Sequence, residues 1–148
     1  AYERNRTFLN LGEGRFAEVA RRLATRGTIV TIGTRDEHAL CEAIPGVNLA
    51  GKTTVGRVAA LLESCALLVT NDSGPLHIAV ALGIPVVGIF RPVEYRRWGA
   101  YPGSRVFRAL YREGPGAQEG ATLPLITVDE VAAASIALLQ HDEALTRA

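Results

Sequence analysis

The sequence predicts an α/β fold of the Rossmann type, a doubly wound parallel sheet with helices on both faces. Apolar runs alternate with helical segments along the chain, and each apolar run is nearly continuous rather than alternating with polar residues. Strands that are buried on both faces have this character, because helical crossovers cover both sides of a parallel sheet. The 148 residues are 48% hydrophobic, which excludes disorder as the main state. We therefore expect residues 1–148 to form a single Rossmann-like domain.

The expected strands are short runs rich in β-branched and aliphatic residues. The sequence TIVTI at residues 28–32 is typical of a buried strand, and VVGIF at residues 86–90 is another. A turn at Pro45-Gly46 precedes a shorter candidate. Strands are expected at residues 28–32, 47–49, 66–70, 86–90 and 104–109, with a possible further strand at residues 7–11.

Helical spacing fills the segments between these strands. Apolar residues recur at i, i+3, i+4 and i+7 in residues 16–23, and Gly27 is placed to stop that helix. Two capping boxes, Thr34 with Glu37 and Thr127 with Glu130, each indicate a helix start. Helices are expected at residues 16–23, 34–43, 55–62, 75–82 and 131–139.

Two further segments lack helical or strand periodicity. Residues 111–124 are rich in Gly, Pro and Glu, which indicates a long flexible loop. The polar tail from His141 is expected to fray.

Composition excludes several classes of protein. Sixteen Lys and Arg against fifteen Asp and Glu give a net charge of +1, so there is no electrostatic reason to expect a nucleic-acid binder. The longest uncharged apolar stretch, residues 78–90, is too short to span a membrane. The first residues are charged and do not resemble a secretory signal. Cys41 and Cys65 fit reduced, buried thiols, so we expect a cytoplasmic protein.

The most informative segment is VTNDSGPLH at residues 69–77, where an expected strand passes directly into a helix. The first N–H groups of a helix have no partner within it, and together with the positive helix end they attract anions. Gly74 leaves room for a phosphate, Ser73 carries a hydroxyl, and His77 can donate to a phosphate oxygen. Asp72 and Ser73 are equally ordinary helix N-cap residues. The whole string at a strand end favours an anion-binding site.

Three other loops follow expected strands, at the sheet edge where ligands bind. Residues 46–53 match the spacing of a phosphate-binding P-loop, but the strand at residues 47–49 lies inside the match, so we reject that interpretation. The loop fits a nucleoside contact, and either threonine can instead cap the next helix. Asp36 can accept ribose hydroxyls, whereas Glu37 fits a capping partner of Thr34. In residues 90–99 the arginines can pair with a diphosphate and the aromatics can close a cleft, or the segment can be a solvated surface loop. The surface loop is favoured for Arg96 and Arg97.

The order of these segments resembles glycosyltransferase family 9, which includes the ADP-heptose:lipopolysaccharide heptosyltransferases. The resemblance spans residues 15–139. It rests on AGKTT at residues 50–54, VTNDSGPLHIA at 69–79, GIPVVGIF at 83–90 and RRWG at 96–99. Residues 14–23 and 127–131 are similar to the first and last helices of the family's C-terminal half.

The resemblance implies one half of a GT-B architecture, the C-terminal donor-binding half. It implies an inverting enzyme that uses no metal and no cofactor, with a donor such as ADP-heptose and a lipopolysaccharide core-type acceptor. The residues it assigns to the donor diphosphate and sugar are Asp72, Ser73, Gly74, Pro75, Leu76 and His77. Those it assigns to the nucleoside are Gly51, Lys52, Thr53 and Thr54, with Asp36 or Glu37 near the ribose.

The sequence departs from the family pattern near its start. Asn10-Leu11-Gly12-Glu13 stands where the family has a basic Lys-Arg-Trp-Pro stretch. The family's N-terminal half, which supplies the acceptor site and the presumed acidic base, is not in the sequence. We therefore expect no certain catalytic residue in this chain and no activity from it alone. Its expected partners are a nucleotide-sugar, a glycolipid or saccharide acceptor and the N-terminal half, through which it would contact the inner membrane.

Two other functions fit the same residues. One is a nucleotide-binding module without catalytic activity. The other is a different GT-B enzyme, such as an epimerase or a hexosamine transferase, that uses a UDP-sugar. The nucleotide that stabilises the chain distinguishes these alternatives.

Overall fold

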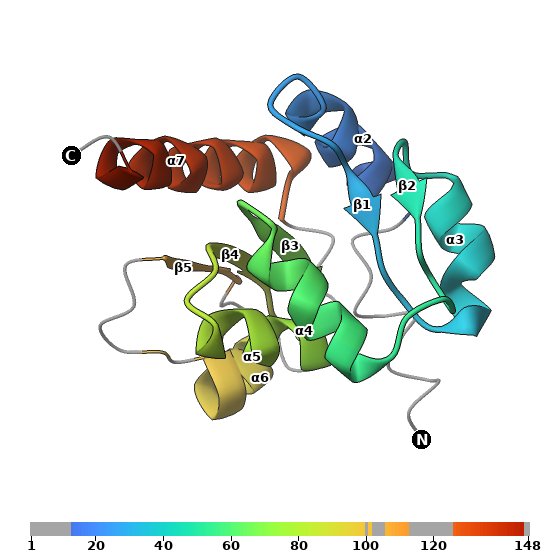
Figure 1. Cartoon of the computed structure of the whole chain (residues 1–148). Coiled ribbons are helices and arrows are strands. Elements are labelled where there is room, and N and C mark those ends of the chain that lie inside the picture. The colour runs from blue at the N-terminus through green and yellow to red at the C-terminus, as the bar shows by residue number, and fades with distance from the viewer. Residues whose placement is uncertain (1–12, 100, 102–105, 113–125, 147–148) are drawn as a thin grey trace.

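A computed structural model describes residues 13–99, 101, 106–112 and 126–146 (Figure 1). The expected strand at residues 7–11 lies outside these residues, as does most of the expected loop at 111–124. The strands are β1 (Val30–Thr31), β2 (Val47–Asn48), β3 (Leu68–Asn71), β4 (Val86–Ile89) and β5 (Phe107–Leu110). The α-helices are α2 (Glu13–Leu23), α3 (His38–Glu42), α4 (Val55–Glu63), α5 (Gly74–Ala81), α6 (Pro92–Glu94) and α7 (Val128–Thr146). A 3₁₀ turn, η1 (Arg35–Glu37), precedes α3, and a π-helical turn, η2 (Tyr95–Gly99), follows α6.

All strand pairs in the described part of the chain are parallel, which confirms the predicted α/β class. The strands form a two-stranded sheet, β1-β2, and a three-stranded sheet, β3-β4-β5. Within the described ranges no backbone pairing joins β1 to β3, so the expected single sheet is present as two pieces. Ile29, beside β1, and Val69, in β3, pack against one core cluster. A shared core therefore links the two sheets where backbone pairing does not.

Strand β4 lies at the centre of the fold and is buried on both faces. Val87 and Ile89 belong to a core cluster with residues of α2 and α7, whereas Val86 and Phe90 belong to a second cluster with residues of α4 and α5. Because successive strand residues point to opposite faces, one short strand anchors both layers. Figure 1 shows α2 and α7 on one side of the strands and α4 and α5 on the other. The predicted cover on both faces is thus confirmed.

Three expectations about single elements need correction. The strand expected at residues 28–32 is only two residues long and half-buried, and the helix expected from residue 34 begins as a 3₁₀ turn. The tail expected to fray from His141 is part of α7, which runs to Thr146. That segment contains Glu143, Ala144 and Leu145, residues of high helix propensity, so the polar character of the tail was a poor guide to its structure.

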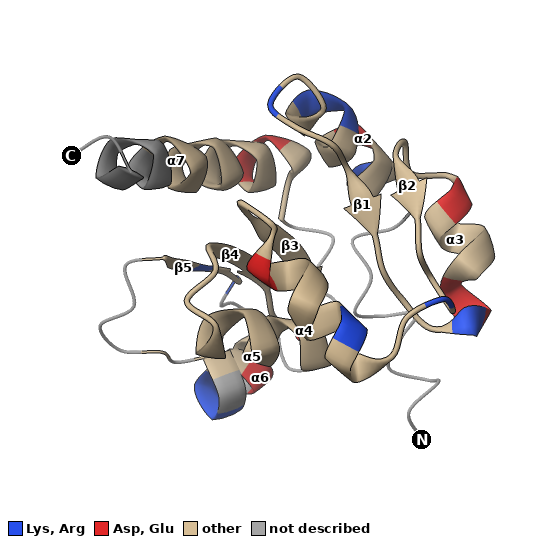
Figure 2. Cartoon of the chain, viewed as in Figure 1, with Lys and Arg blue, Asp and Glu red and all other residues tan. Residues whose placement is uncertain are grey.

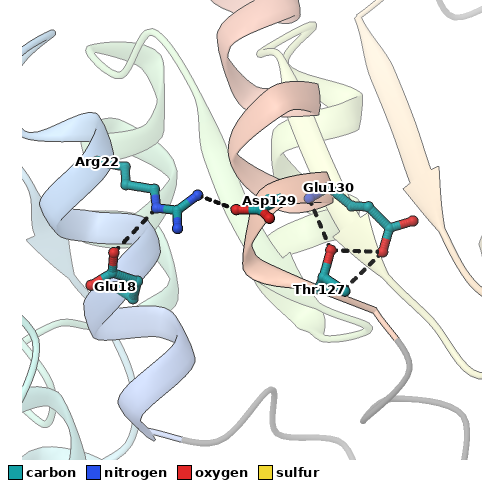
Figure 3. Close-up of polar contacts among 5 residues, drawn as sticks. All are labelled: Glu18, Arg22, Thr127, Asp129 and Glu130. Carbon is teal, nitrogen blue, oxygen red and sulfur yellow. Dashed lines mark hydrogen bonds and ion pairs between the residues drawn. The ribbon is translucent and has the colours of Figure 1, made fainter.

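Helices α2 and α7 pack together and are also joined by polar contacts (Figure 3). Arg22 of α2 contacts Glu18 one turn away and Asp129 in the first turn of α7. At the start of α7, the backbone N–H and hydroxyl of Thr127 donate to the Glu130 carboxylate at 2.9 and 3.0 Å. The Thr127 hydroxyl accepts from the Glu130 N–H at 3.2 Å. The predicted capping box at this helix start is therefore confirmed.

Figure 2 shows basic and acidic residues interspersed over the helices, in keeping with the near-neutral composition. No described helix combines the length and apolar character that crossing a membrane requires.

Candidate functional site

The candidate site is the turn between β3 and α5. Strand β3 ends at Asn71, and α5 begins at Gly74 after an extended N-cap residue, Ser73. The Asp72 N–H donates to the Ile89 carbonyl of β4 at 3.1 Å, so the turn lies at the carboxyl end of this parallel pair. Ligands of open α/β sheets bind at that edge. The structure thus places the predicted segment on the edge of the sheet that its proposed role requires.

The start of α5 offers fewer N–H groups than the sequence analysis assumed. Pro75 has no N–H, and the Leu76 N–H donates to the Ser73 carbonyl at 3.1 Å. For the N–H groups of Ser73 and Gly74, no acceptor is found among the described residues. Two neighbouring amides therefore remain for an anion, and the helix end favours one.

The turn is open beside these amides. Gly74 is exposed, and apart from its chain neighbours and the backbone of its own helix no described atom lies within 4 Å of the position that a Cβ would occupy. The Thr70 hydroxyl donates to the Asn71 carbonyl at 2.9 Å and lies 3.0 Å from the Ser73 hydroxyl oxygen. The Ser73 proton is thus directed to Thr70. The Ser73 hydroxyl is therefore already engaged within the turn, whereas the space beside Gly74 is open.

Leu76 and Pro75 have a structural role in this turn. The Leu76 side chain is fully buried in the cluster with Val86 and Phe90, so it presents no surface to a donor substrate. Pro75 occupies the first turn of α5, where its fixed φ suits a helix and its missing N–H costs little. The assignment of Leu76 to the donor stays a prediction, and the burial of its side chain leaves only its backbone to make such a contact.

His77 lies between two polar side chains. Its Nε2 is 3.7 Å from a carboxylate oxygen of Asp72, and its Nδ1 is hydrogen-bonded to the hydroxyl of Tyr101. The Asp72 side chain is 13% exposed and that of His77 is 43% exposed. Burial raises the pKa of Asp72, while His77 and Arg91 act to lower it. The His77 imidazole is thus accessible from solvent, although both of its nitrogens face protein groups.

Arg91 and Tyr101 were not predicted as individual contributors to this site. Arg91, at the start of α6, forms an ion pair with Glu94 and is close enough to Asp72 to influence its pKa. Arg96 and Arg97 are exposed, as the sequence analysis favoured. Tyr101 is 24 residues from His77 in the sequence and belongs to no periodic segment, so no local pattern could have joined the two.

The loops after β1 and β2 contact one another. The Gly51 N–H donates to the Gly33 carbonyl at 2.9 Å. Gly51 has φ +72°, and a Cβ there would lie 2.8 Å from the Arg35 Cα. Asp36 and Lys52 are exposed, and Thr53 is half-buried. Most of the residues assigned to a nucleoside thus form one loop pair, held by backbone contact.

Several residues of this loop pair have the structural roles that the sequence allowed. Glu37 accepts from the Thr34 backbone and hydroxyl at 2.7 and 2.9 Å. The Thr54 hydroxyl caps α4 by accepting from the Arg57 N–H at 3.3 Å. The Lys52 Nζ donates to the Asn48 carbonyl at 3.0 Å. Because β2 lies inside the P-loop match, the rejection of a P-loop is confirmed.

The described residues include no group of three or more His, Cys, Asp or Glu side chains that could hold a metal ion. Cys41 is buried and Cys65 half-buried, and both are free thiols. Burial raises the pKa of each.

The fold and the site define a Rossmann-like α/β unit with an open strand-to-helix turn at its sheet edge. Residues 12–122 match the model of glycosyltransferase family 9 (heptosyltransferase). This match covers more than half of the chain, so the chain belongs to glycosyltransferase family 9, and the resemblance noted from the motifs is confirmed.

Similar characterised proteins and a similar solved structure support this family assignment. Over 53% of its length the chain is 35% identical to lipooligosaccharide heptosyltransferase 2 of Haemophilus influenzae, covering 26% of that protein. Over 69% of its length it is 31% identical to lipopolysaccharide heptosyltransferase 3 of Escherichia coli, covering 31% of that protein. The solved structure of E. coli ADP-heptose lps heptosyltransferase II matches with a TM-score of 0.75 and 28% identity, over 91% of this chain and 43% of that one.

The chain is much shorter than these relatives. It spans about a quarter of the length of the first curated relatives that it matches and less than half of the solved structure. The part of a heptosyltransferase that it matches is therefore a single Rossmann-like half.

Proposed function

We propose that this chain is the donor-binding half of an inverting glycosyltransferase that moves heptose or a related sugar from an ADP-sugar to a lipopolysaccharide core-type acceptor. The observation that carries the proposal is the open turn after β3. There the amides of Ser73 and Gly74 have no acceptor among the described residues, and the exposed His77 follows in the first turns of α5. Family membership and the matched heptosyltransferases support the choice of reaction.

The geometry suits a reaction in which a diphosphate leaves. An acceptor hydroxyl attacks the anomeric carbon, the bond from that carbon to the bridging oxygen breaks, and the nucleoside diphosphate departs with the electron pair. Attack on the face opposite the leaving group inverts the anomeric centre. Negative charge grows on the bridging oxygen and the β-phosphate, where the two amides and His77 can stabilise it without reorganisation. Losing one such donor raises the barrier by about 3 kcal/mol in comparable sites.

The remaining parts of the proposal concern the nucleoside and the other half of the protein. Residues 51–54 would meet the nucleoside through backbone groups, and the exposed carboxylate of Asp36 would accept ribose hydroxyls. The second Rossmann-like half would supply the acceptor site, the base and contact with the inner membrane from the cytoplasm. No metal or cofactor enters this scheme.

Thermal stabilisation by nucleotides tests the donor assignment. ADP is expected to raise the Tm of the chain more than UDP or GDP does, because binding to the folded state alone stabilises it. A preference for UDP would favour a different GT-B enzyme. No response to any of the three would favour a module without nucleotide chemistry and would overturn the proposal.

The substitution His77→Ala tests the site itself. We expect it to weaken ADP binding about tenfold or more while leaving the Tm nearly unchanged, because a hydrogen bond to a charged group is lost from an exposed side chain. Titration calorimetry and thermal unfolding measure the two effects. Arg26→Ala, at an exposed position before β1 and at the opposite end of that strand from Asp36, is the control that should leave ADP binding intact. Equal losses of affinity and stability in His77→Ala would argue against a ligand contact.

A further inference from the structure

We propose that Tyr101 is a positioning residue that holds the proton of neutral His77 on Nε2 and turns that nitrogen toward the anion at the start of α5. The role of the anion rests on the proposed function, whereas the assignment of the proton does not. Three contacts support this role: Tyr101 with His77, His77 with Asp72, and Tyr101 with Phe107.

Tyr101 lies outside α5 and is held in place by packing against β5 and the core. The rings of Tyr101 and Phe107 meet edge to face, with centroids 5.0 Å apart and planes at 79°. Phe107 belongs to β5, and Tyr101 packs against the core cluster that contains Phe90. A ring fixed in this way brings its hydroxyl to the imidazole of α5 at a set position. The orientation of His77 is therefore determined by a residue from another part of the fold.

The surroundings of the two ring nitrogens determine where the proton lies. In a neutral imidazole one nitrogen donates and the other accepts. The Asp72 carboxylate, 3.7 Å from Nε2, favours a proton on that nitrogen. Nδ1 then carries the lone pair and accepts from the Tyr101 hydroxyl. The opposite arrangement would point the Nε2 lone pair at a carboxylate oxygen. Burial and the nearby Asp72 raise the pKa of Tyr101, which keeps the phenol protonated and able to donate.

This arrangement leaves Nε2–H available to a ligand. The separation of 3.7 Å between Nε2 and the Asp72 carboxylate is longer than a hydrogen bond. The carboxylate therefore attracts the proton electrostatically but does not form a hydrogen bond with it. A phosphate oxygen at the amides of Ser73 and Gly74 can take that proton as a hydrogen-bond partner. Because a neutral Nε2–H suffices, binding does not require the imidazolium form.

The tautomer of His77 can be measured directly by NMR. The chain has three histidines, so the ¹⁵N shifts of the rings can be assigned with His77→Ala as a reference. At about pH 8, where an ordinary histidine is neutral, we expect His77 to be the Nε2–H tautomer. In Tyr101→Phe we expect a mixture of tautomers. Tyr111→Phe is the control, because the described residues offer its hydroxyl no hydrogen bond.

Binding of ADP then links the tautomer to function. Tyr101→Phe should weaken ADP binding about threefold to tenfold, as expected for the loss of one neutral hydrogen bond, and Tyr111→Phe should not. An unchanged tautomer in Tyr101→Phe overturns the inference, as does a shifted tautomer with unchanged ADP affinity. If the native chain does not bind ADP, the proposed function fails, but the tautomer measurement still decides whether Tyr101 positions His77.

Discussion

Asp72 is a largely buried carboxyl group beside His77 in the candidate site. It is 13% exposed, it faces His77 and Arg91, and the net effect of burial is to raise its pKa. A carboxyl whose pKa is higher in the folded state than in the unfolded state opposes folding once it is ionised. The unfavourable contribution is present above the folded-state pKa and disappears as the pH falls below the unfolded-state value.

We therefore expect Asp72→Asn to raise the Tm at neutral pH, with a gain that shrinks as the pH falls toward the normal carboxyl range. Thermal unfolding of both proteins at several pH values between about 7 and 4 measures the trend. Asp129→Asn is a suitable control, since that carboxylate is 81% exposed. A lower Tm for Asp72→Asn at neutral pH would show that the electrostatic attraction of Asp72 to His77 and Arg91 outweighs the cost of its burial.

Gly51 is a second residue at which local geometry sets a clear expectation. Its φ of +72° strains any residue with a side chain, and an added Cβ would lie 2.8 Å from the Arg35 Cα. Gly51→Ala should destabilise the fold by roughly 1–3 kcal/mol, as chemical denaturation would show.

Gly56→Ala provides the matched comparison for Gly51. Gly56 lies within α4 with nothing within 4 Å of an added Cβ, so alanine there should stabilise by about 0.5–1 kcal/mol. Equal effects at the two positions would contradict the structural distinction between them.

Among the elements, helix starts followed local sequence signals most closely. Both predicted capping boxes are present, and the helices at residues 55–62 and 75–82 are observed within one or two residues of their expected bounds. A cap consists of contacts within four residues, so the sequence alone contains it. Strand lengths follow the sequence less well, because pairing with a distant neighbour determines where a strand ends. Residues 28–32 show this, with only two residues paired.

The capping box of α7 gives a prediction at the scale of an element. Thr127→Ala removes the side chain that accepts from the Glu130 N–H and donates to the Glu130 carboxylate. We expect a loss of about 1 kcal/mol in the free energy of unfolding, as is usual for an N-cap. The control is Asp129→Ala, which breaks only the exposed contact with Arg22 and should have a smaller effect. A larger loss of unfolding free energy in Asp129→Ala than in Thr127→Ala would show that the ion pair with Arg22 stabilises this junction more than the capping box does.

At the scale of the whole molecule, burial on both faces of β4 determines stability. Two leucines of the α5 region differ in burial. Leu76 is fully buried in the core next to β4, whereas Leu82, at the end of α5, is 38% exposed. Leu76→Ala should lower the free energy of unfolding by about 2–5 kcal/mol, and Leu82→Ala by much less. Denaturant unfolding followed by both circular dichroism and tryptophan fluorescence tests this, with coincident transitions expected if the two layers unfold together. Similar losses in the two variants would contradict the burial pattern.

The candidate site could be predicted only in part. The turn at residues 71–77 was found because a strand end and a helix start are both local signals. The sequence already shows that Pro75 has no N–H to offer. Only the structure shows that the Leu76 N–H is bonded to the Ser73 carbonyl, which leaves the amides of Ser73 and Gly74. The contribution of Tyr101 was not predictable, because it reaches the site by packing against Phe107 of β5. Arg91 lies in a loop that was expected at this edge, but its proximity to Asp72 depends on the pairing of β3 with β4.

By itself the sequence determined the α/β class, the positions of most helices, the family and the segment that forms the turn between β3 and α5. These features depend on periodicity, capping and short motifs, which act over a few residues. Only the tertiary structure decided that the strands form two sheets, that Leu76 faces the core, and that His77 is held between Asp72 and Tyr101. Those outcomes depend on contacts between residues far apart in the chain, and such contacts exist only once the layers have packed around β4.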